Sequence, residues 1–347
     1  MDLGEIKKRI QEHFTDGLVI IVGSGTSVAQ GLPSMAQLAE HLIANPPELA
    51  SGEQTKLWEN VASSLKAGND LEATLQDVEL DEHLESHVVG EVASLIEDRE
   101  RDALCRILRD GVRLPMSELL SHLFKTRRSL TVITTNYDRL VEFAAERIGL
   151  RVDSTFVGTF FGHFDPQSSK ESLTVAVTMR RKPTRFQKTY IPHITVLKPH
   201  GSLGWFGHEG GIVRCGLHVN LPRLLIAPGK TKLRRGYEPP FDRHREMANL
   251  AIDSAASLLI LGYGFGDGEL HTHLLPRVSA GCPCLVMTRS LSLKAAHFLK
   301  SASRVIALSS NGVNGEDGTR AFVNGDTADF AGVSLWDLEI LHSEVLQ

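Results

Sequence analysis

Hydrophobic and polar positions along this chain change period repeatedly, and the changes divide it into short strands and amphipathic helices. Short apolar runs predict strands at 18–22, 130–134, 193–197, 257–262, 283–288 and 304–308. Apolar residues at helical spacing predict helices at 2–14, 138–148, 241–255, 268–278 and 291–301. Strands that alternate with helices are typical of parallel βαβ units. We therefore expect an α/β fold in which a Rossmann-like parallel sheet is flanked by helices.

Between the first two strands the pattern is helical throughout. Ser34 is expected to cap a helix that ends before Asn45, and from about 53 to 127 the apolar residues recur at helical spacing. We assign 50–128 to a helical insertion, which a minimal Rossmann unit lacks. The insertion lies within one domain that is expected to cover 1–347.

Two segments depart from the alternation of strands and helices. The mixed segment 151–196 includes an expected strand at 172–178, and a further strand is expected after it at 223–227. Residues 309–327 are rich in Gly, Asn and Asp, which is typical of a long loop. Together with the residues that follow, they are expected to form a C-terminal loop and arm over 309–347.

The charge of the chain argues against a general affinity for nucleic acid. Its 347 residues carry 37 Lys and Arg against 42 Asp and Glu, a formal net charge of −5. No direct nucleic-acid binding is therefore expected, and the basic runs at 180–182 (with Arg185 and Lys188) and 230–235 are interpreted as solvated loops. No apolar stretch approaches the ~20 residues that span a bilayer, and the N-terminus lacks a signal-peptide pattern. We expect a cytoplasmic protein.

The four cysteines do not form a zinc-binding pattern. Cys105 and Cys215 stand alone, and one residue separates Cys282 from Cys284. A structural zinc site needs four ligands, usually two pairs of cysteines with two residues inside each pair. We therefore expect no metal, and buried neutral thiols at all four positions.

Four segments place polar residues at or near the carboxyl ends of predicted strands. They are VIIVGSGTSVAQGLP (19–33), TTNYD (134–138), LKPHGS (197–202) and LGYGFGD (261–267). Open α/β sheets bind ligands at this edge, and a glycine turn between a strand and a helix can hold a pyrophosphate on backbone N–H groups. One such segment is weak support, because glycine turns often only connect elements. Four of them in this order predict one nucleotide pocket.

The glycine-rich segments supply most of the candidate nucleotide-binding residues. These candidates are Gly23, Ser24, Gly25, Thr26, Ser27, Pro33, Gly262, Gly264, Asp267 and Thr288. We expect Gly23 and Gly25 to bring the backbone close to phosphate, and Ser27 to donate its hydroxyl there. The alternative is a plain strand-to-helix turn. The third glycine of a dinucleotide fingerprint is absent, because Val28 stands in its place, and Asp267 could equally be a helix cap.

The four segments resemble the silent-information-regulator (sirtuin-like) family. GSGTS (23–27) followed by GLP (31–33) is similar to the family's opening Gly-Ala-Gly-x-Ser and Gly-Ile-Pro. TTNYD (134–138) resembles the bacterial antiphage branch, whereas the deacylase branch carries Thr-Gln-Asn-x-Asp. That branch's Lys-Leu-His-Gly-Ser and Gly-Tyr-Ser-Phe-x-Asp are similar to the last two segments, except that Pro199 replaces leucine and Gly264 replaces serine. The resemblance covers about 17 to 300 and implies a single sirtuin-like NAD-binding domain.

The resemblance also implies a reaction, which is cleavage of the bond between nicotinamide and ribose in NAD. Such a cleavage passes through an oxocarbenium-like ribose. The leaving pyridine is already cationic, so it departs neutral and needs no general acid. The protein must instead orient the ribose, provide a group that acts on its hydroxyls or on water, and exclude solvent.

Two residues are the catalytic candidates for this reaction. Asn136 suits the orienting role because an amide can both donate and accept, although it could instead cap the next helix. His200, which is followed by Gly201 and Ser202, suits the role of base because histidine ordinarily titrates near pH 6.5. Gly201 is counted with the nucleotide-binding residues. Asp138 could anchor Asn136, bind ribose hydroxyls, or serve only the dipole of its helix.

The function implied by the resemblance is a NAD glycohydrolase that releases nicotinamide and ADP-ribose. In the antiphage branch this reaction depletes NAD during infection and so aborts phage propagation. Such an enzyme is expected to be silent until a trigger acts. We expect a homo-oligomer and a separate activating protein, such as a HerA-type translocase or a short Argonaute.

Two alternatives from other functional classes remain open. One is a non-catalytic sensor that binds NAD or ADP-ribose and passes its occupancy to a partner. The other is an NAD-dependent deacylase or ADP-ribosyltransferase, although the missing zinc cysteines argue against deacylation.

Overall fold

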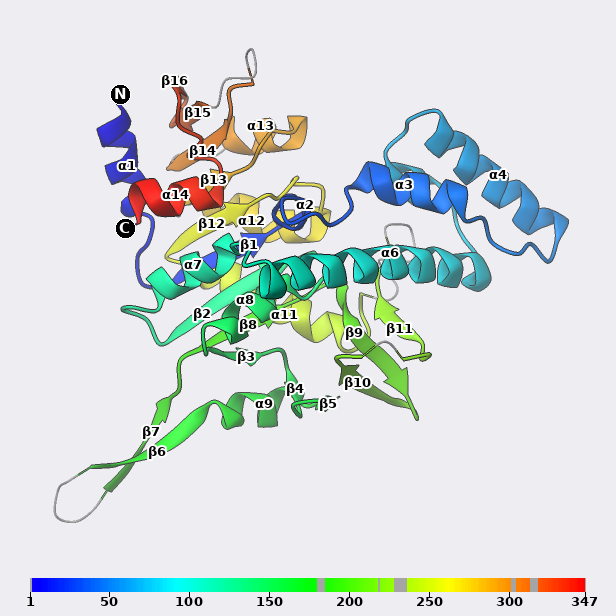
Figure 1. The fold of residues 1–347 in the computed structure, drawn as a ribbon, viewed down its shortest axis with the longest axis horizontal. Helices are drawn as coiled ribbons and strands as arrows, with labels where there is room; N and C mark the ends of the chain where they lie inside the picture. Colours follow the sequence, from blue (N-terminus) through cyan, green and yellow to red (C-terminus); the bar gives the residue numbers. More distant parts are fainter. Residues whose placement is uncertain are drawn as a thin grey trace.

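A nine-stranded sheet with helices on both faces forms the centre of the protein (Figure 1). The computed structural model describes residues 2–179, 185–217, 219–227, 236–300, 304–312 and 318–346. The sheet order is β16-β15-β14-β13-β12-β1-β2-β8-β3. These strands are β1 (Leu18–Val22), β2 (Ser129–Thr134), β3 (Arg151–Asp153), β8 (His193–Leu197), β12 (Ser257–Leu261), β13 (Cys284–Met287), β14 (Val305–Ser310), β15 (Gly318–Val323) and β16 (Asp326–Ala331). From β14 to β3 the neighbours are parallel, which confirms the predicted α/β fold with a Rossmann-like sheet.

Both faces of the sheet are buried, as the apolar strands require. Along β1, Ile20 and Val22 pack on one face, and Val19 and Ile21 pack on the other. The first face is covered by α1 (Leu3–Gln11), α7 (Pro115–Leu123), α8 (Leu140–Arg147) and α14 (Leu338–Val345). The second face is covered by α11 (Phe241–Ser254), α12 (Gly268–Ser279) and α13 (Leu293–Lys300). Covered in this way, a parallel sheet offers its strand ends to ligands.

The helical insertion follows β1. It contains α2 (Ser24–Val28), α3 (Met35–Ala44), α4 (Gly52–Lys66), α5 (Leu71–Asp77) and α6 (Glu82–Arg109). Ser34 caps α3 as predicted, in a reciprocal pair with Gln37. Helices α3 to α6 share a third hydrophobic cluster, and α4 lies far out from the sheet (Figure 1). Helix α7, which falls within the assigned 50–128, packs in the hydrophobic cluster of the sheet.

Two ion pairs join the long helix α6 to the body of the protein. The Glu100 carboxylate accepts hydrogen bonds from the backbone N–H and the guanidinium of Arg139, at the start of α8. Burial raises the pKa of Glu100, while the charge of Arg139 acts in the opposite direction. Glu97 Oε2 lies 2.6 Å from a guanidinium nitrogen of Arg223. These contacts anchor the insertion beside the carboxyl ends of the strands.

Segment 151–227 is richer in strands than its sequence predicts. A five-stranded antiparallel sheet has the order β11-β9-β10-β5-β4. Its strands are β4 (Phe156–Val157), β5 (Phe161–Phe164), β9 (Gly201–His208), β10 (Gly211–Cys215) and β11 (Arg223–Leu225). Helix α9 (Pro166–Ser172) leads into a separate hairpin of β6 (Thr174–Met179) and β7 (Arg185–Tyr190), which projects from the body (Figure 1). The predicted strands at 172–178 and 223–227 correspond to β6 and β11.

Within the expected C-terminal loop and arm (309–347), described residues form two strands and a helix. Strands β15 and β16 extend the sheet as an antiparallel hairpin. Helix α14 packs against α7 and α1, and Lys7 Nζ lies 2.6 Å from Glu344 Oε2. The two chain ends therefore lie next to each other (Figure 1).

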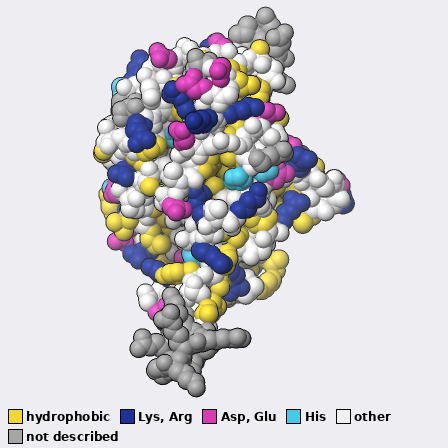
Figure 2. Space-filling view, turned by 90° about the vertical axis from the view of Figure 1, so that its left-hand side faces the viewer, with side chains coloured by type: hydrophobic (Ala, Val, Ile, Leu, Met, Phe, Trp, Pro, Cys, Tyr) yellow, Lys and Arg dark blue, Asp and Glu magenta, His cyan; other side chains and the backbone are white. Residues whose placement is uncertain are grey.

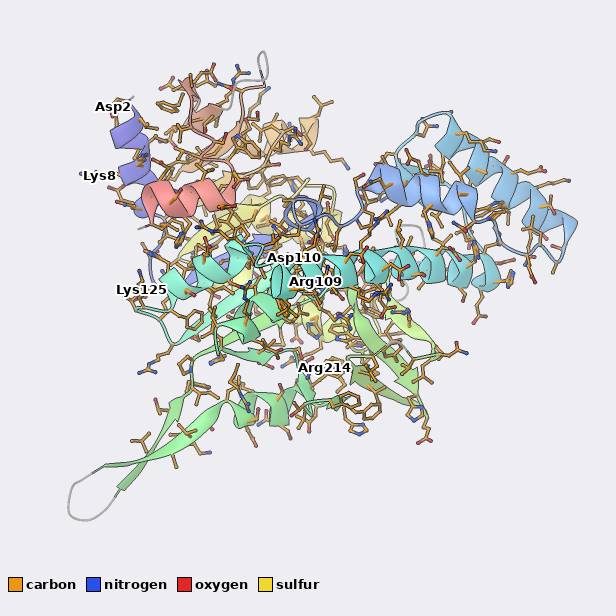
Figure 3. All side chains as sticks on the ribbon, in the orientation of Figure 1. Asp2, Lys8, Arg109, Asp110, Lys125 and Arg214 are labelled. Carbon is orange, nitrogen blue, oxygen red and sulfur yellow. The ribbon has the colours of Figure 1, made fainter. Side chains whose placement is uncertain are left out.

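The surface mixes charges of both signs. Figure 2 shows acidic and basic side chains interspersed over one face, and Arg109 and Asp110 at the end of α6 are an example, with Nε and Oδ1 3.0 Å apart (Figure 3). Basic residues 180–182 and 230–235 lie outside the described residues. Cys105 is exposed, contrary to prediction, because it lies on the outer side of α6, whereas Cys215, Cys282 and Cys284 are buried. In the described part of the chain, no helix combines the length and apolar character needed to cross a bilayer.

Candidate functional site

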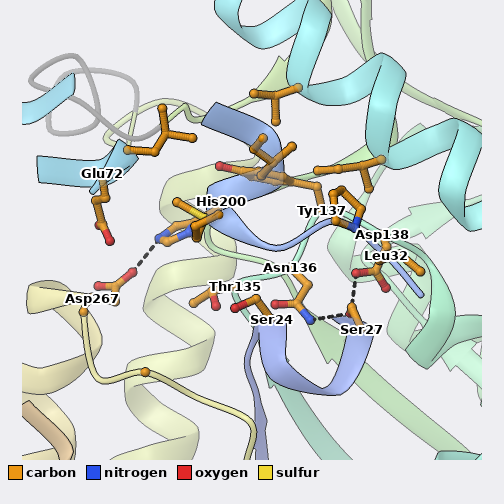
Figure 4. Close-up of a pocket in the computed structure, with 18 of the residues that line it drawn as sticks. Ser24, Ser27, Leu32, Glu72, Thr135, Asn136, Tyr137, Asp138, His200 and Asp267 are labelled. Carbon is orange, nitrogen blue, oxygen red and sulfur yellow. Dashed lines mark hydrogen bonds and ion pairs between the residues drawn. The ribbon is translucent and has the colours of Figure 1, made fainter. Parts of the chain in front are cut away.

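A cavity of about 370 Å³ lies at the carboxyl ends of the central strands. Residues from all four predicted segments line it, together with residues of the helical insertion (Figure 4). From β1 the chain proceeds to β2 on one side of the sheet, whereas from β12 it proceeds to β13 on the other. The cavity therefore lies beside the point where the strand order reverses, which is where open α/β sheets bind ligands.

The structure divides the predicted site residues between two cavities. The first is lined by Ser24, Ser27, Pro33, Asn136, Asp138, His200, Gly264 and Asp267. The second, of about 560 Å³, is lined by Gly25, Thr26, Ser27, Asp138, Gly262 and Thr288. Ser27 and Asp138 line both cavities, so the two meet at this pair. Gly23 and Gly201 are absent from both linings.

The glycines of the first segment serve the packing of two loops. A Cβ at Gly23 would lie 2.5 Å from the Gly262 carbonyl oxygen, and one at Gly25 would lie 2.9 Å from the Gly262 Cα. The Gly25 N–H donates to that same carbonyl at 2.9 Å. Gly23 and Gly25 therefore allow the turn to approach the backbone of the LGYGFGD segment, while their approach to phosphate stays a prediction.

Gly201 is needed by its own turn. Its φ of +91° is left-handed, and a Cβ there would lie 2.2 Å from the Leu224 carbonyl oxygen. It shapes the loop that presents His200 and does not reach the cavity.

The Asn136 amide is held by the glycine turn. Its Nδ2 donates to the Gly23 carbonyl oxygen at 3.0 Å and to Ser27 Oγ at 2.8 Å. A carbonyl can only accept, which fixes the nitrogen on this side. Both amide hydrogens are therefore committed within the protein, and Oδ1 is left to accept from a ligand. The alternative role as a helix cap is wrong, since Asp138 Oδ1 accepts from the Leu140 N–H at 3.1 Å.

Asp138 anchors Asn136 through Ser27. Ser27 Oγ donates to Asp138 Oδ2 at 2.6 Å, so its hydrogen does not point toward a phosphate as predicted. Asp138 is 4% exposed and Asn136 9% exposed. This buried chain of three side chains joins the strand ends of β1 and β2 (Figure 4).

His200 faces a second buried carboxylate. Its Nε2 lies 2.5 Å from Asp267 Oδ2, in ion-pair contact but without the alignment of a hydrogen bond. Asp267 Oδ1 accepts from the backbone N–H groups of Glu269 and Leu270. Asp267 therefore caps α12, as its alternative interpretation predicts, and also faces the imidazole (Figure 4).

Further polar residues line the cavity outside the predicted set, among them Glu72, Tyr263 and Lys294. Glu72 on α5 points toward Asp267 and His200 (Figure 4), and a Cβ at Gly266 would lie 3.2 Å from Glu72 Oε2. Tyr263 is buried, and among the described residues its hydroxyl has no hydrogen-bond partner. Lys294 on α13 is the third. Glu72 carries no signal in the sequence, because its helix is remote from every motif.

Burial keeps the tyrosine hydroxyls of the cavity protonated. Burial first, and then the nearby carboxylate of Asp267, raises the pKa of Tyr263. Burial likewise raises the pKa of Tyr137, whose hydroxyl donates to the Ile226 carbonyl oxygen at 2.7 Å. Tyr263 therefore keeps its proton throughout the physiological range.

One family model matches part of the chain. Residues 130–278 match the SIR2-like domain. The match runs from β2 to α12 and includes Asn136, His200 and Asp267. No curated protein matches the chain. Within the described residues, no group of three or more His, Cys, Asp or Glu is placed to hold a metal ion.

Solved sirtuin structures match the chain at low similarity. A structure on the basis of sirtuin substrate affinity has a TM-score of 0.40 and 12% identity, covering 88% of this chain and 93% of that one. Sir2Tm bound to a propionylated peptide has a TM-score of 0.41 and 11% identity, covering 88% and 92%. A structure on the mechanism and regulation of Sir2 enzymes has a TM-score of 0.40 and 13% identity, covering 87% and 91%. Similarity at this level does not bear on activity.

Proposed function

We propose that the protein hydrolyses NAD to nicotinamide and ADP-ribose. The observation that carries this proposal is that Asn136 and His200, from two different strand ends, line one cavity. The match of residues 130–278 to the SIR2-like domain supports NAD as the substrate. A volume of about 370 Å³ for the first cavity lies in the range of small-molecule sites.

The geometry suggests how the side chains act on the substrate. Asn136 Oδ1 accepts from a ribose hydroxyl or from the attacking water. As the bond from ribose to nicotinamide breaks, its electron pair moves to the ring nitrogen and neutralises the pyridinium. Water then bonds to the anomeric carbon and gives a proton to His200. With Nε2 facing Asp267, Nδ1 is the ring nitrogen that accepts this proton.

The second cavity suggests where the rest of the dinucleotide lies. Gly262, Thr26 and Thr288 line it, and it meets the first cavity at Ser27 and Asp138. A dinucleotide is longer than one such cavity, so we assign the nicotinamide riboside to the first and the adenosine to the second.

Nicotinamide release from NAD, measured by chromatography, tests the proposal. Asn136→Ala and His200→Ala are each expected to lower the rate by roughly 100-fold or more, as removal of an orienting or basic group does. Asn69→Ala and His83→Ala are matched controls, because both residues are exposed on the insertion. Thermal unfolding checks that all four variants fold.

The assay is run on the protein alone and after assembly with an activating partner. Absence of nicotinamide release by the unmodified protein in every assembly state would contradict the proposal. Release that depends on an added acyl-lysine peptide would identify a deacylase instead. A biological effect that survives His200→Ala would identify a sensor.

We further propose that this hydrolysis serves antiphage defence by depleting NAD. The support is the resemblance of TTNYD and LKPHGS to the antiphage branch. The proposal includes a cytoplasmic homo-oligomer and a separate activator such as a HerA-type translocase or a short Argonaute. Infected cells with the unmodified protein should lose NAD and yield fewer phage than cells with His200→Ala. Equal NAD levels in both would refute this role.

A further inference from the structure

We propose that Lys198 is a positioning residue that holds Asn136 and His200 at a fixed separation. This inference rests on the proposed function, because it gives Lys198 a role in that reaction. Lys198 follows β8 directly and precedes His200 by two residues. It is 1% exposed. It does not line the cavity, so it is not expected to touch substrate.

The side chain of Lys198 joins the loops that carry the two catalytic candidates. Its Nζ donates to the backbone carbonyl oxygen of Asp138 at 2.5 Å, and it lies 3.2 Å from Glu142 Oε1 on α8. Asp138 lies two residues after Asn136. One ammonium therefore connects the end of β8, just before His200, to the end of the loop after Asn136.

The backbone of Lys198 is held from the opposite side. Its N–H donates to Nδ1 of His244, on α11, at 3.1 Å. Burial and the charge of Lys198 lower the pKa of His244 to about 3, so the ring is neutral. Nε2 therefore carries the hydrogen and donates to Thr155 Oγ1 at 2.8 Å. Anchored at both ends, the lysine has little freedom to swing away.

Besides the charged contact of Lys198, hydrogen bonds between neutral groups also hold these loops. The Leu203 N–H donates to the Tyr137 carbonyl oxygen at 2.9 Å, and the Tyr137 hydroxyl donates to Ile226. A buried ammonium is costly, and a methionine would fill the same space without desolvation. A charged donor is stronger than a neutral one and is fixed in direction. The lysine therefore suits the task of setting geometry better than the task of filling volume.

The test compares Lys198→Met with the double variant Lys198→Met/Glu142→Gln. The single variant leaves the Glu142 charge without its partner, whereas the double variant removes both charges. For both we expect kcat for nicotinamide release to fall about 100-fold, since a displacement of about 1 Å at a reacting group has an effect of this size. KM should change less than about threefold, because Lys198 does not line the cavity. Lys66→Met, exposed at the end of α4, is the control.

Unfolding temperature separates positioning from general stability. We expect the double variant to recover the unfolding temperature that the single variant loses, while its kcat stays low. If the double variant instead recovers kcat to within about threefold of the unmodified protein, Lys198 only balances the charge of Glu142 and the inference is wrong.

A crystal structure of the double variant tests the inference without reference to catalysis. The inference expects residues 136–138 to shift relative to His200, and an unchanged arrangement of these backbones would overturn it. This readout also distinguishes two failures. If the unmodified protein releases no nicotinamide, the proposed function is wrong, while the shift or its absence still decides whether Lys198 positions the two loops.

Discussion

The two walls of the first cavity are built in different ways. The strand wall, formed by Asn136, Asp138, His200 and Asp267, is fixed by hydrogen bonds and ion pairs to backbone and to other buried side chains. The insertion wall is mostly apolar, with Met35, Leu38, Leu71, Val92 and Ile96 packed in the cluster of α3 to α6 and Glu72 as a polar exception. Directional contacts hold the first wall, and non-directional packing holds the second.

This difference indicates that the two walls have different roles. Reacting groups need geometry held within a fraction of an ångström, which hydrogen bonds from strand ends can provide. An apolar wall excludes water and shapes the cavity, and it tolerates small shifts of its helices. Changes in the strand wall should therefore lower kcat, whereas changes in the insertion wall should act on binding.

The largest change in the strand wall is expected for Asp267→Asn. Asparagine can still cap α12, so the helix start is retained. The charge that faces His200 is lost, and kcat for nicotinamide release should fall roughly 100-fold, the lower end of what a general base contributes. Asp165→Asn, at the cap of α9, is the matched control. An unchanged kcat would show that His200 works without Asp267.

The next effect concerns how the free energy of unfolding depends on pH through His244. His244 has its pKa lowered to about 3 by burial, whereas an unfolded histidine titrates near 6.5. Below pH 6.5 the unfolded state therefore binds the proton that the folded state excludes, and the free energy of unfolding falls with falling pH. The loss is about 1.4 kcal/mol per pH unit between pH 6.5 and about 3.

Chemical denaturation between pH 4.5 and 7 measures this slope. His244→Gln retains an acceptor for the Lys198 N–H and removes the titration, so the slope should flatten by about that amount per unit. His83→Gln, exposed on α6, should keep the full slope. The same slope in His244→Gln would assign the acid sensitivity to other groups.

Sequence patterns predicted the strand wall well because its position follows from topology. Parallel strands end at one edge, so polar residues after 22, 134, 197 and 261 had to come together. The hydrogen-bond and ion-pair partners of these side chains could not be predicted from topology. Nothing in the spacing shows that Ser27 donates to Asp138, or that Asp267 caps a helix with one oxygen and faces His200 with the other.

Two hairpins that were not predicted have a sequence signal in their turn residues. Asn324-Gly325 lies between β15 and β16, and both residues have positive φ, as does the pair Glu209-Gly210 between β9 and β10. An Asn-Gly pair is a strong hairpin signal when apolar residues flank it. The glycine and asparagine content of 309–327 is typical of a loop, whereas the position of Asn324-Gly325 between two strands is typical of a hairpin turn. Contacts of the insertion wall had no such signal, since packing between distant helices leaves no local pattern.

The smallest effect is expected where the insertion wall adds a charge to the cavity. The Glu72 carboxylate points toward the region of His200 (Figure 4), and the proposed substrate brings a cationic pyridinium into the same cavity. One charge pair at a partly exposed site contributes about 1 kcal/mol. Glu72→Gln should therefore raise KM for NAD about fivefold and leave kcat nearly unchanged.

Inhibition by NADH should not weaken, because its dihydropyridine ring is neutral. Glu59→Gln, exposed on α4, is the control. A fall in kcat with unchanged KM would place Glu72 among the residues that act on the reaction. The assignment of different roles to the two walls would then be wrong.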